Sequence, residues 1–256
     1  MLVCAGLDPS GGAGLLADLE ALAGVGACGW AVATAVTAQG HRGALAVEPV
    51  EAAVLRAEVE ALLGGPERAS AVKVGMLGTA ANAAALAEVL GGRRLGRLPL
   101  VLDPVLAASS GLSLFDAGGR PPAEALAALC ARAALVTPNW PELERLAGRS
   151  LGSDEEAVRA ARELPARAVL VKGGHREGAA VDLLVRARRV VSLAGRRRPG
   201  TAPGTGCRLA SAVAGLLARG VPLEEAIRGA KRRVERYLDE AGPGGRRAGA
   251  GARKLA

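Results

Sequence analysis

The chain has 256 residues, half of them apolar and only 2% aromatic, with a formal net charge of +8. This length and apolar content suffice for one α/β domain with a full core, and the shortage of aromatic rings disfavours stacking on single-stranded nucleic acid. The basic excess is mostly scattered arginine without a recognition motif, so we expect no nucleic-acid partner, with a basic nucleic-acid-binding protein kept as an alternative.

We expect neither a structural zinc site nor a membrane segment. The chain has four cysteines and two histidines, and no two cysteines show the CxxC spacing typical of zinc ligands. We expect a cytoplasmic protein with reduced thiols, in which Cys4, Cys28 and Cys130 are small buried apolar residues. No secretory pattern opens the chain, and no apolar stretch of membrane-spanning length is free of glycine or charge.

The first half of the chain alternates short apolar runs with segments of helical periodicity. Residues 29–38 are apolar and β-branched, which predicts a central strand of a sheet. Thr79 precedes a helical segment and is predicted to cap it. We predict strands over residues 2–6, 29–38, 71–74 and 99–102, and helices over residues 15–25, 50–63, 80–90 and 123–132.

The second half continues the alternation and adds a hairpin. Pro141 is predicted to start a helix, since proline is favoured in the first helical turn. Ser153 is predicted to cap the next helix, which runs to residue 164. Residues 180–184 and 189–193 are typical of a hairpin. The remaining predictions are strands over residues 135–136 and 168–172 and helices over residues 207–219 and 223–240.

This alternation predicts an α/β fold with a mostly parallel central sheet and helices on both faces. We predict one domain over residues 1–242 and a mobile Gly/Arg-rich tail over residues 243–256. Ligands of such sheets bind beyond the carboxyl ends of the strands. The residues that follow the predicted strands are Asp8, Gln39, Met76, Gly78, Asp103, Asn139 and Lys172.

A glycine-rich turn, Gly204-Thr205-Gly206-Cys207, opens one of the last two predicted helices. The first turn of a helix has unpaired backbone N–H groups and a partial positive charge, so it can hold a phosphate or a phosphoryl group in transfer. Cys207 would lie in this first turn, where the pKa of a thiol tends to fall. The alternative is a plain helix start with a buried cysteine.

The segment Asn139-Trp140-Pro141-Glu142 places an amide and a carboxylate at another predicted helix start. Together with Asp103 at the end of a neighbouring strand, it could hold Mg²⁺ through waters. Alternatively, Glu142 only complements the helix dipole. No GxxxxGK[ST] segment is present, and Gly11-Gly12-Ala13-Gly14 lacks the GxGxxG spacing, so neither a P-loop nor a dinucleotide site is expected.

Seven short blocks follow one another in a fixed order: residues 8–14 with Asp18, 34–39, 73–77, 102–105, 137–142, 171–175 and 204–207. In this order and spacing, from about residue 2 to residue 240, they resemble the hydroxymethylpyrimidine/phosphomethylpyrimidine kinases of thiamine biosynthesis. The resemblance implies a ribokinase-like fold. It implies ATP- and Mg²⁺-dependent phosphorylation of 4-amino-5-hydroxymethyl-2-methylpyrimidine and then of its monophosphate, by a homodimer.

The resemblance also implies which residues bind the pyrimidine. Gln39 would hydrogen-bond the aminopyrimidine ring. The loop around Gly6 and Gly14, with Asp18, and the region of Met76 would complete the pocket.

The metal, nucleotide and catalytic residues implied by the resemblance come from four later blocks. Asn139 and Glu142 would bind Mg²⁺ and phosphate with Asp103 nearby, and Lys172 would line the nucleotide site. The remaining implied residues are Gly204, Thr205 and Gly206, whose backbone would stabilise the phosphoryl group, and Cys207, which as a thiolate would accept the hydroxyl proton.

Three segments depart from the family pattern. Ser109 replaces a lysine that the family places near phosphates, and Thr201-Ala202-Pro203 replaces Asn-Thr-His, with Gly200 in place of a common lysine. Gly242-Pro243-Gly244-Gly245-Arg246 replaces a Gly-His-Gly region. Two alternatives therefore stay open: a pyridoxal-type kinase on the same fold, and a weakened paralogue that binds the pyrimidine as a sensor.

Overall fold

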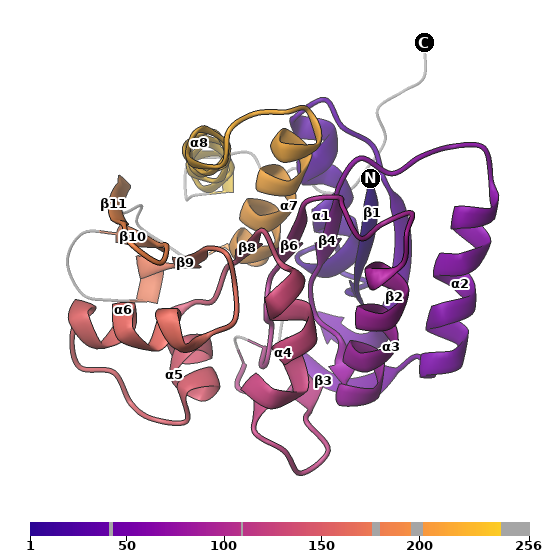
Figure 1. Cartoon of the computed structure of the whole chain (residues 1–256), viewed down its shortest axis with the longest axis horizontal. Helices are drawn as coiled ribbons and strands as arrows, with labels where there is room; N and C mark the ends of the chain where they lie inside the picture. The colour runs from indigo at the N-terminus through magenta and orange to yellow at the C-terminus, as the bar shows by residue number, and fades with distance from the viewer. Residues whose placement is uncertain (41–42, 109, 176–179, 196–201, 242–256) are drawn as a thin grey trace.

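A twisted nine-stranded sheet runs through the computed structural model, which describes residues 1–40, 43–108, 110–175, 180–195 and 202–241 (Figure 1). The strand order is β11-β10-β9-β8-β6-β4-β1-β2-β3. These strands are, along the sheet, β11 (Val190–Gly195), β10 (Ala180–Val185), β9 (Val169–Val171), β8 (Leu135–Val136), β6 (Leu100–Leu102), β4 (Val72–Val74), β1 (Leu2–Leu7), β2 (Trp30–Gly40) and β3 (Gly43–Pro49).

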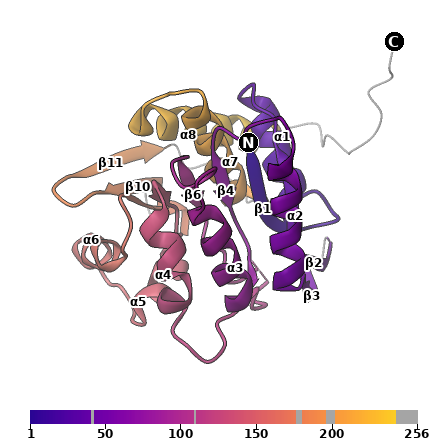
Figure 2. The same ribbon diagram turned by 45° about the vertical axis from the view of Figure 1, so that its right-hand side comes forward.

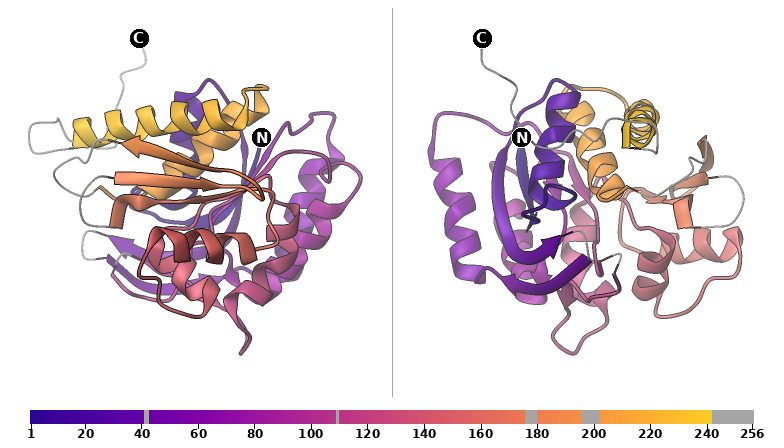
Figure 3. Two further views of the ribbon diagram at one scale, coloured as in Figure 1. Left: turned by 60° about the vertical axis from the view of Figure 1, so that its left-hand side comes forward. Right: turned by 180° about the vertical axis from the view of Figure 1, so that it is seen from behind.

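The six middle strands, from β9 to β2, are parallel, as the sequence predicts. Parallel strands are covered on both faces, which fits their nearly continuous runs of valine and leucine. Antiparallel pairs occur at both ends of the sheet, where β10 pairs with β9 and β11, and β3 pairs with β2 (Figure 3). The strand predicted over residues 29–38 is β2, which is internal to the sheet and pairs with β1 on one side and with β3 on the other.

Helices cover both faces of the sheet, as predicted (Figure 2). Alternate residues of β6 point to opposite faces of the sheet. Leu100 and Leu102 belong to the hydrophobic cluster on one face, whereas Val101 belongs to the cluster on the other face, together with Val213 of α7. The first set is α1 (Gly14–Gly24), α7 (Thr205–Ala218) and α8 (Leu223–Ala241). The second set is α2 (Ala52–Gly64), α3 (Ala80–Gly91), α4 (Pro122–Arg132), α5 (Trp140–Ala147) and α6 (Asp154–Glu163).

Side-chain caps fix where two of these helices, α3 and α6, begin. Thr79 accepts a hydrogen bond from the Asn82 amide at 3.1 Å, and Ser153 accepts one from the Glu156 amide at 3.3 Å, both as predicted.

Two further short pieces stand outside the main sheet. They are the 3₁₀ turn η1 (Gly173–His175) and the two-stranded sheet of β5 (Gly78–Thr79) and β7 (Phe115–Asp116).

Among the cysteines predicted to be buried, Cys4 and Cys130 are buried, but Cys28 is exposed. Cys28 lies in the connection between α1 and β2, outside either packed layer, which explains the wrong prediction. No helix in the described ranges has the length and apolar character needed to cross a bilayer. The predicted tail, residues 243–256, lies outside the described residues.

Candidate active site

Three neighbouring parallel strands end in polar residues that contact one another. Asp103 follows β6, Thr137 follows β8 and Lys172 follows β9. The Lys172 ammonium lies 2.8 Å from Oδ1 of Asp103, and the Thr137 hydroxyl donates to the same oxygen at 2.9 Å. Within the described part of the chain, the buried Oδ2 of Asp103 has no hydrogen-bond partner. One acceptor at this sheet edge is therefore available to a ligand.

The start of α5 brings a second carboxyl group to the same lysine. Asn139 accepts from the Glu142 amide at 2.8 Å, and Glu142 accepts from the Asn139 amide at 2.7 Å, which together form a capping box. Oε2 of Glu142 lies 3.7 Å from the Lys172 ammonium. The capping geometry therefore fixes Glu142 beside the Asp103–Lys172 pair, as the sequence predicts for a site at this edge.

The electrostatics of this group differ from residue to residue. Burial alone would raise the pKa of Asp103, but the cations of Lys172 and Lys73 outweigh it and hold the pKa below its ordinary value. Burial alone would lower the pKa of Lys172, but the carboxylates of Asp103 and Glu142 raise it instead. For Glu142, burial prevails over Lys172 and raises the pKa to about 7. Asp103 and Lys172 are therefore charged at neutral pH, whereas Glu142 titrates close to neutrality.

The glycine-rich turn at the start of α7 lies over this group. A methyl group added at Gly206 would be 3.0 Å from the Lys172 ammonium and 3.9 Å from Oδ2 of Asp103. Gly204 caps α7 in the left-handed region, at a φ of 68°, and a Cβ there would be 2.2 Å from the Gly12 carbonyl oxygen. Thr205 is the first residue of the helix. Only glycine fits this close approach at residue 204. The N–H groups of the first helical turn, which have no partner within the helix, lie next to Lys172 because Gly206 has no side chain.

Cys207 lies between this turn and the loop that follows β1. Burial raises the pKa of its thiol to about 11, although Lys73 and a hydrogen bond from the Gly14 backbone favour the thiolate. The prediction of a lowered pKa is therefore wrong for the protein without ligands, because removal from water outweighs the helix start and the neighbouring cation. The contact with Gly14 nevertheless joins the turn to the loop.

The residues predicted to bind the pyrimidine lie near the carboxyl ends of β1, β2 and β4. A Cβ at Gly6 would be 2.7 Å from the sulfur of Met76, and a Cβ at Gly14 would be 2.2 Å from the Gly6 carbonyl oxygen. The Gln39 amide donates to Oδ2 of Asp8 at 3.2 Å. The structure therefore brings Gly6, Gly14, Met76 and Gln39 to one side of Cys207.

Asp18 lies deeper than these residues, inside α1. Its Oδ2 is 2.6 Å from the Lys73 ammonium, and its Oδ1 accepts from the Ser211 hydroxyl at 2.7 Å. Burial alone would lower the pKa of Lys73, but Asp18, together with Cys207 and Asp103, outweighs burial and raises the pKa. Both oxygens of Asp18 are thus bonded within the protein. Sequence reasoning missed this cluster, although a lone lysine between two valines of a buried strand signals a buried charged partner.

The donors at this edge fit a magnesium ion only together with a ligand. In the described ranges, no three histidine, cysteine or acidic side chains are arranged to hold a metal ion. Mg²⁺ commonly takes one or two carboxylates, several waters and the phosphates of a substrate. Two carboxyl groups next to Lys172, those of Asp103 with its unpaired Oδ2 and of Glu142, fit this pattern for an Mg²⁺ ion that arrives bound to a nucleotide.

A mostly parallel sheet with a glycine-rich helix start over a lysine and a carboxylate defines a small-molecule kinase of the ribokinase-like class. The family described as phosphomethylpyrimidine kinase matches residues 8–251. The chain belongs to this family.

Individual relatives agree with this assignment. The chain is 43% identical to a hydroxymethylpyrimidine/phosphomethylpyrimidine kinase of Rhizobium meliloti, over 90% of this chain and 86% of the relative. The crystal structure of a phosphomethylpyrimidine kinase from Clostridium difficile superposes with a TM-score of 0.77 at 33% identity, covering 93% of this chain and 98% of the other.

A pyridoxal kinase is also similar. The enzyme from Staphylococcus aureus in complex with AMP-PCP and pyridoxal has a TM-score of 0.78 at 28% identity, covering 91% of this chain and 85% of the other. The fold predicted from the sequence is thus confirmed, and the solved relatives include a kinase complex with an ATP analogue.

Proposed function

We propose that this protein transfers the γ-phosphoryl group of ATP, with Mg²⁺, to 4-amino-5-hydroxymethyl-2-methylpyrimidine and then to its monophosphate, in thiamine biosynthesis. One observation carries the proposal. In the turn at residues 204–207, Gly206 lies so close to Lys172 and Asp103 that a Cβ there would be 3.0 Å and 3.9 Å from them, and Cys207 is hydrogen-bonded to the Gly14 backbone. A single helix start therefore joins a phosphate-binding edge to a pocket for a small ring.

On the nucleotide side, Lys172 and the amides of Gly204, Thr205 and Gly206 would neutralise the charge of the phosphoryl group. Asn139 would keep Glu142 in place through the capping box. Asp103 and Glu142 would hold Mg²⁺ through the free oxygen and through waters. When bound, Mg²⁺ supplies charge neutralisation between the phosphates of ATP.

On the pyrimidine side, Gln39 would hydrogen-bond the ring, held in place by Asp8. The absence of side chains at Gly6 and Gly14 leaves room for the Met76 sulfur and for the Gly6 carbonyl, and Met76 would close the pocket as an apolar wall. Asp18 would support the pocket from beneath through Lys73 and Ser211, since its oxygens are already bonded.

Cys207 would take the proton of the hydroxyl group under attack. Because the pKa of its thiol is about 11 without ligands, the thiolate is the minor form at neutral pH. We propose that the thiolate forms in the complex with both substrates, with Lys73 as the cation that favours it. Phosphoryl transfer leaves little covalent chemistry to the protein, so positioning and charge neutralisation would supply most of the acceleration.

The test is ADP release by the purified protein with ATP and Mg²⁺, with the hydroxymethylpyrimidine, its monophosphate and pyridoxal offered separately. Turnover of both pyrimidines, lost in Cys207→Ala, supports the proposal. Turnover of the monophosphate alone restricts it to the second step. Binding of the pyrimidine without turnover overturns the kinase proposal and favours the alternative of a paralogue that binds the pyrimidine as a sensor. That alternative rests on Ser109 and Thr201, which lie outside the described ranges.

A pyridoxal-type kinase is the second candidate, favoured by the likeness to the Staphylococcus aureus complex with pyridoxal. A higher kcat/KM for pyridoxal than for either pyrimidine would establish it. We further propose a homodimer, which light scattering tests, and a cytoplasmic enzyme with no nucleic-acid partner, for which a binding assay with DNA and RNA at moderate salt is the check.

A further inference from the structure

Arg208 directly follows Cys207 and is buried, with only 8% of its surface exposed. It lies in the first turn of α7, where the helix dipole disfavours a cation. A buried charge also loses its hydration and is tolerated only when it is paired. The residues around Arg208 must therefore compensate for an unfavourable position.

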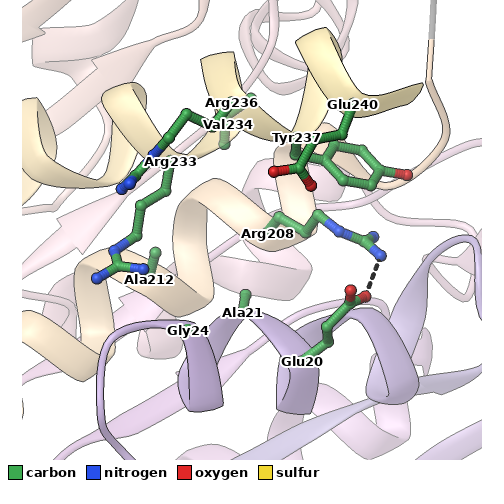
Figure 4. A pocket seen from close by; sticks show the side chains of 10 residues that line it. All are labelled: Glu20, Ala21, Gly24, Arg208, Ala212, Arg233, Val234, Arg236, Tyr237 and Glu240. Atoms are coloured by element: carbon green, nitrogen blue, oxygen red, sulfur yellow. Dashed lines mark hydrogen bonds and ion pairs between the residues drawn. The ribbon is translucent and has the colours of Figure 1, made fainter. Parts of the chain in front are cut away.

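Arg208 contacts three separate segments of the chain. Its Nη1 donates to the Gly12 carbonyl oxygen at 3.1 Å, and its Nη2 lies 2.5 Å from Oε2 of Glu20 on α1. Its Cζ stacks 4.1 Å from the ring centre of Tyr237 on α8. Figure 4 shows this guanidinium between Glu20 and Tyr237, at one end of a cleft between α1, α7 and α8. We name Arg208, Glu20 and Tyr237 the clasp.

The clasp also holds the turn that precedes Cys207. The Tyr237 hydroxyl donates to the Pro203 carbonyl oxygen at 3.2 Å. A Cβ at Gly204 would lie 3.0 Å from Nη1 of Arg208, so the guanidinium packs closely against the cap of α7. Pro203 and Gly204 are thus contacted by Tyr237 and Arg208, just ahead of the residues proposed to bind the phosphoryl group.

The loop after β1 meets the turn at two places. Gly14 hydrogen-bonds Cys207 and Gly12 accepts from Arg208. The Glu20 side chain is 67% exposed, and ion pairs with such exposed partners contribute little to stability. Stability alone therefore does not account for the placement of Arg208.

We propose that Arg208 is a positioning residue, which holds the turn at residues 204–207 against the loop at residues 8–14, with Tyr237 supporting it from α8. When the pyrimidine binds at the loop of residues 8–14, this contact passes the change in the loop's position to Cys207 and to the amides that face the phosphoryl group. This role rests on the proposed kinase function. In this role the clasp does not touch the reacting atoms.

The first test compares Arg208→Met with Arg219→Met. Arg219 ties the other end of α7 to α1, by donating to the Val25 carbonyl oxygen at 2.6 Å, and lies far along the helix from Cys207. Because a small misplacement of catalytic groups is costly, we expect Arg208→Met to lower kcat roughly 10- to 100-fold, with the KM for the pyrimidine within about threefold. Arg219→Met should keep kcat within about twofold.

A conservative variant separates geometry from charge. Arg208→Lys keeps the cation but lacks the planar fork that reaches Gly12, Glu20 and the Tyr237 ring together. We expect its kcat to lie between those of the wild type and Arg208→Met. All assays are run well below the midpoint of thermal unfolding of each variant, so that loss of folded protein does not enter kcat.

The second test uses the fact that the chain contains one tyrosine. Protein labelled with 3-fluorotyrosine gives one ¹⁹F resonance, which reports on Tyr237. We expect this resonance to move when the hydroxymethylpyrimidine is added to the wild type, and not to move in Arg208→Met. The same titration is repeated with magnesium and AMP-PCP.

The two tests distinguish the role from the proposed function. If the wild type turns over no substrate, the kinase proposal fails, and the ¹⁹F titrations alone decide the role of the clasp. Equal kcat values for Arg208→Met and Arg219→Met overturn the positioning role. A resonance that no ligand moves in the wild type, or that moves equally in Arg208→Met, also overturns it.

Discussion

Glu142 is the carboxyl group whose titration should be visible in the stability of the protein. Burial raises its pKa in the folded state to about 7, from an ordinary value of 4.5. The folded state therefore binds this proton more tightly than the unfolded state, and the wild type loses stability as pH rises from about 4.5 to about 7. A variant without the carboxyl group, Glu142→Gln, avoids that loss.

We expect the unfolding midpoint of Glu142→Gln, minus that of the wild type, to increase between pH 5 and pH 8. Thermal unfolding in a pH series measures it. Glu163→Gln is the matched control, because Arg149 lowers the pKa of Glu163 on the surface, so removal of that carboxyl group should give no increase with pH. A difference for Glu142→Gln that stays flat or falls would contradict the raised pKa.

Cys207 provides a second test at the scale of one residue. With a thiol pKa of about 11, its alkylation by iodoacetamide should accelerate roughly tenfold per pH unit from pH 7 to pH 10, since only the thiolate reacts. The experiment uses Cys28→Ser, because Cys28 is exposed whereas Cys4 and Cys130 are buried. Mass spectrometry of the Cys207 peptide measures the rate. A plateau below pH 8 would show a lowered pKa instead.

At the scale of the element, the start of α7 depends on the absence of a side chain at Gly206. A methyl group there would lie 3.0 Å from the Lys172 ammonium, which must then move relative to Asp103. Because alanine is a better helix former than glycine, we expect Gly206→Ala to change stability by less than about 1 kcal/mol while lowering kcat roughly 10- to 100-fold.

Paired measurements of kcat and of urea unfolding test this separation. Gly91→Ala is the control, since a Cβ at that position in α3 meets no atom within 4 Å. It should keep kcat at the wild-type value. An unchanged kcat for Gly206→Ala would show that the contact between α7 and Lys172 does not matter for transfer.

Elements with a strong local signal could be predicted, and those without one could not. Thr79 and Ser153 predict helix starts because their side chains can cap the next turn, and both side chains do so in the structure. β3 was missed because an edge strand is half exposed and needs no continuous apolar run. β5 and β7 have two residues each, which is too short for a periodic pattern.

The candidate site divides in the same way. Polar residues at strand ends, such as Asp103 and Lys172, could be predicted to meet because parallel strands end at one edge. The pKa of Cys207 could not, because it depends on how completely the thiol is removed from water. The contact of Arg208 with Gly12 also gave no local signal, since 196 residues separate the two.

At the scale of the whole molecule, the Lys73–Asp18 pair joins the sheet to the helices on one face. Lys73 belongs to β4 and Asp18 to α1, and Ser211 of α7 donates to the same carboxylate. Both charged side chains have no exposed surface. A charge left alone at such a depth is strongly destabilising, so we expect Lys73→Met to lose roughly 3–5 kcal/mol of unfolding free energy at neutral pH.

The pH dependence of this loss identifies its cause. Burial already raises the pKa of Asp18, and removal of the Lys73 cation raises it further. The folded variant then binds a proton more tightly than the unfolded variant, so its deficit should be smaller at pH 5 than at pH 8. Urea unfolding at both pH values measures the difference. The double variant Lys73→Met/Asp18→Asn, which leaves no buried charge in the pair, should recover part of the loss and show little pH dependence. A deficit in Lys73→Met that is equal at both pH values and is not relieved by Asp18→Asn would mean that lost packing, rather than an unpaired carboxylate, destabilises the fold.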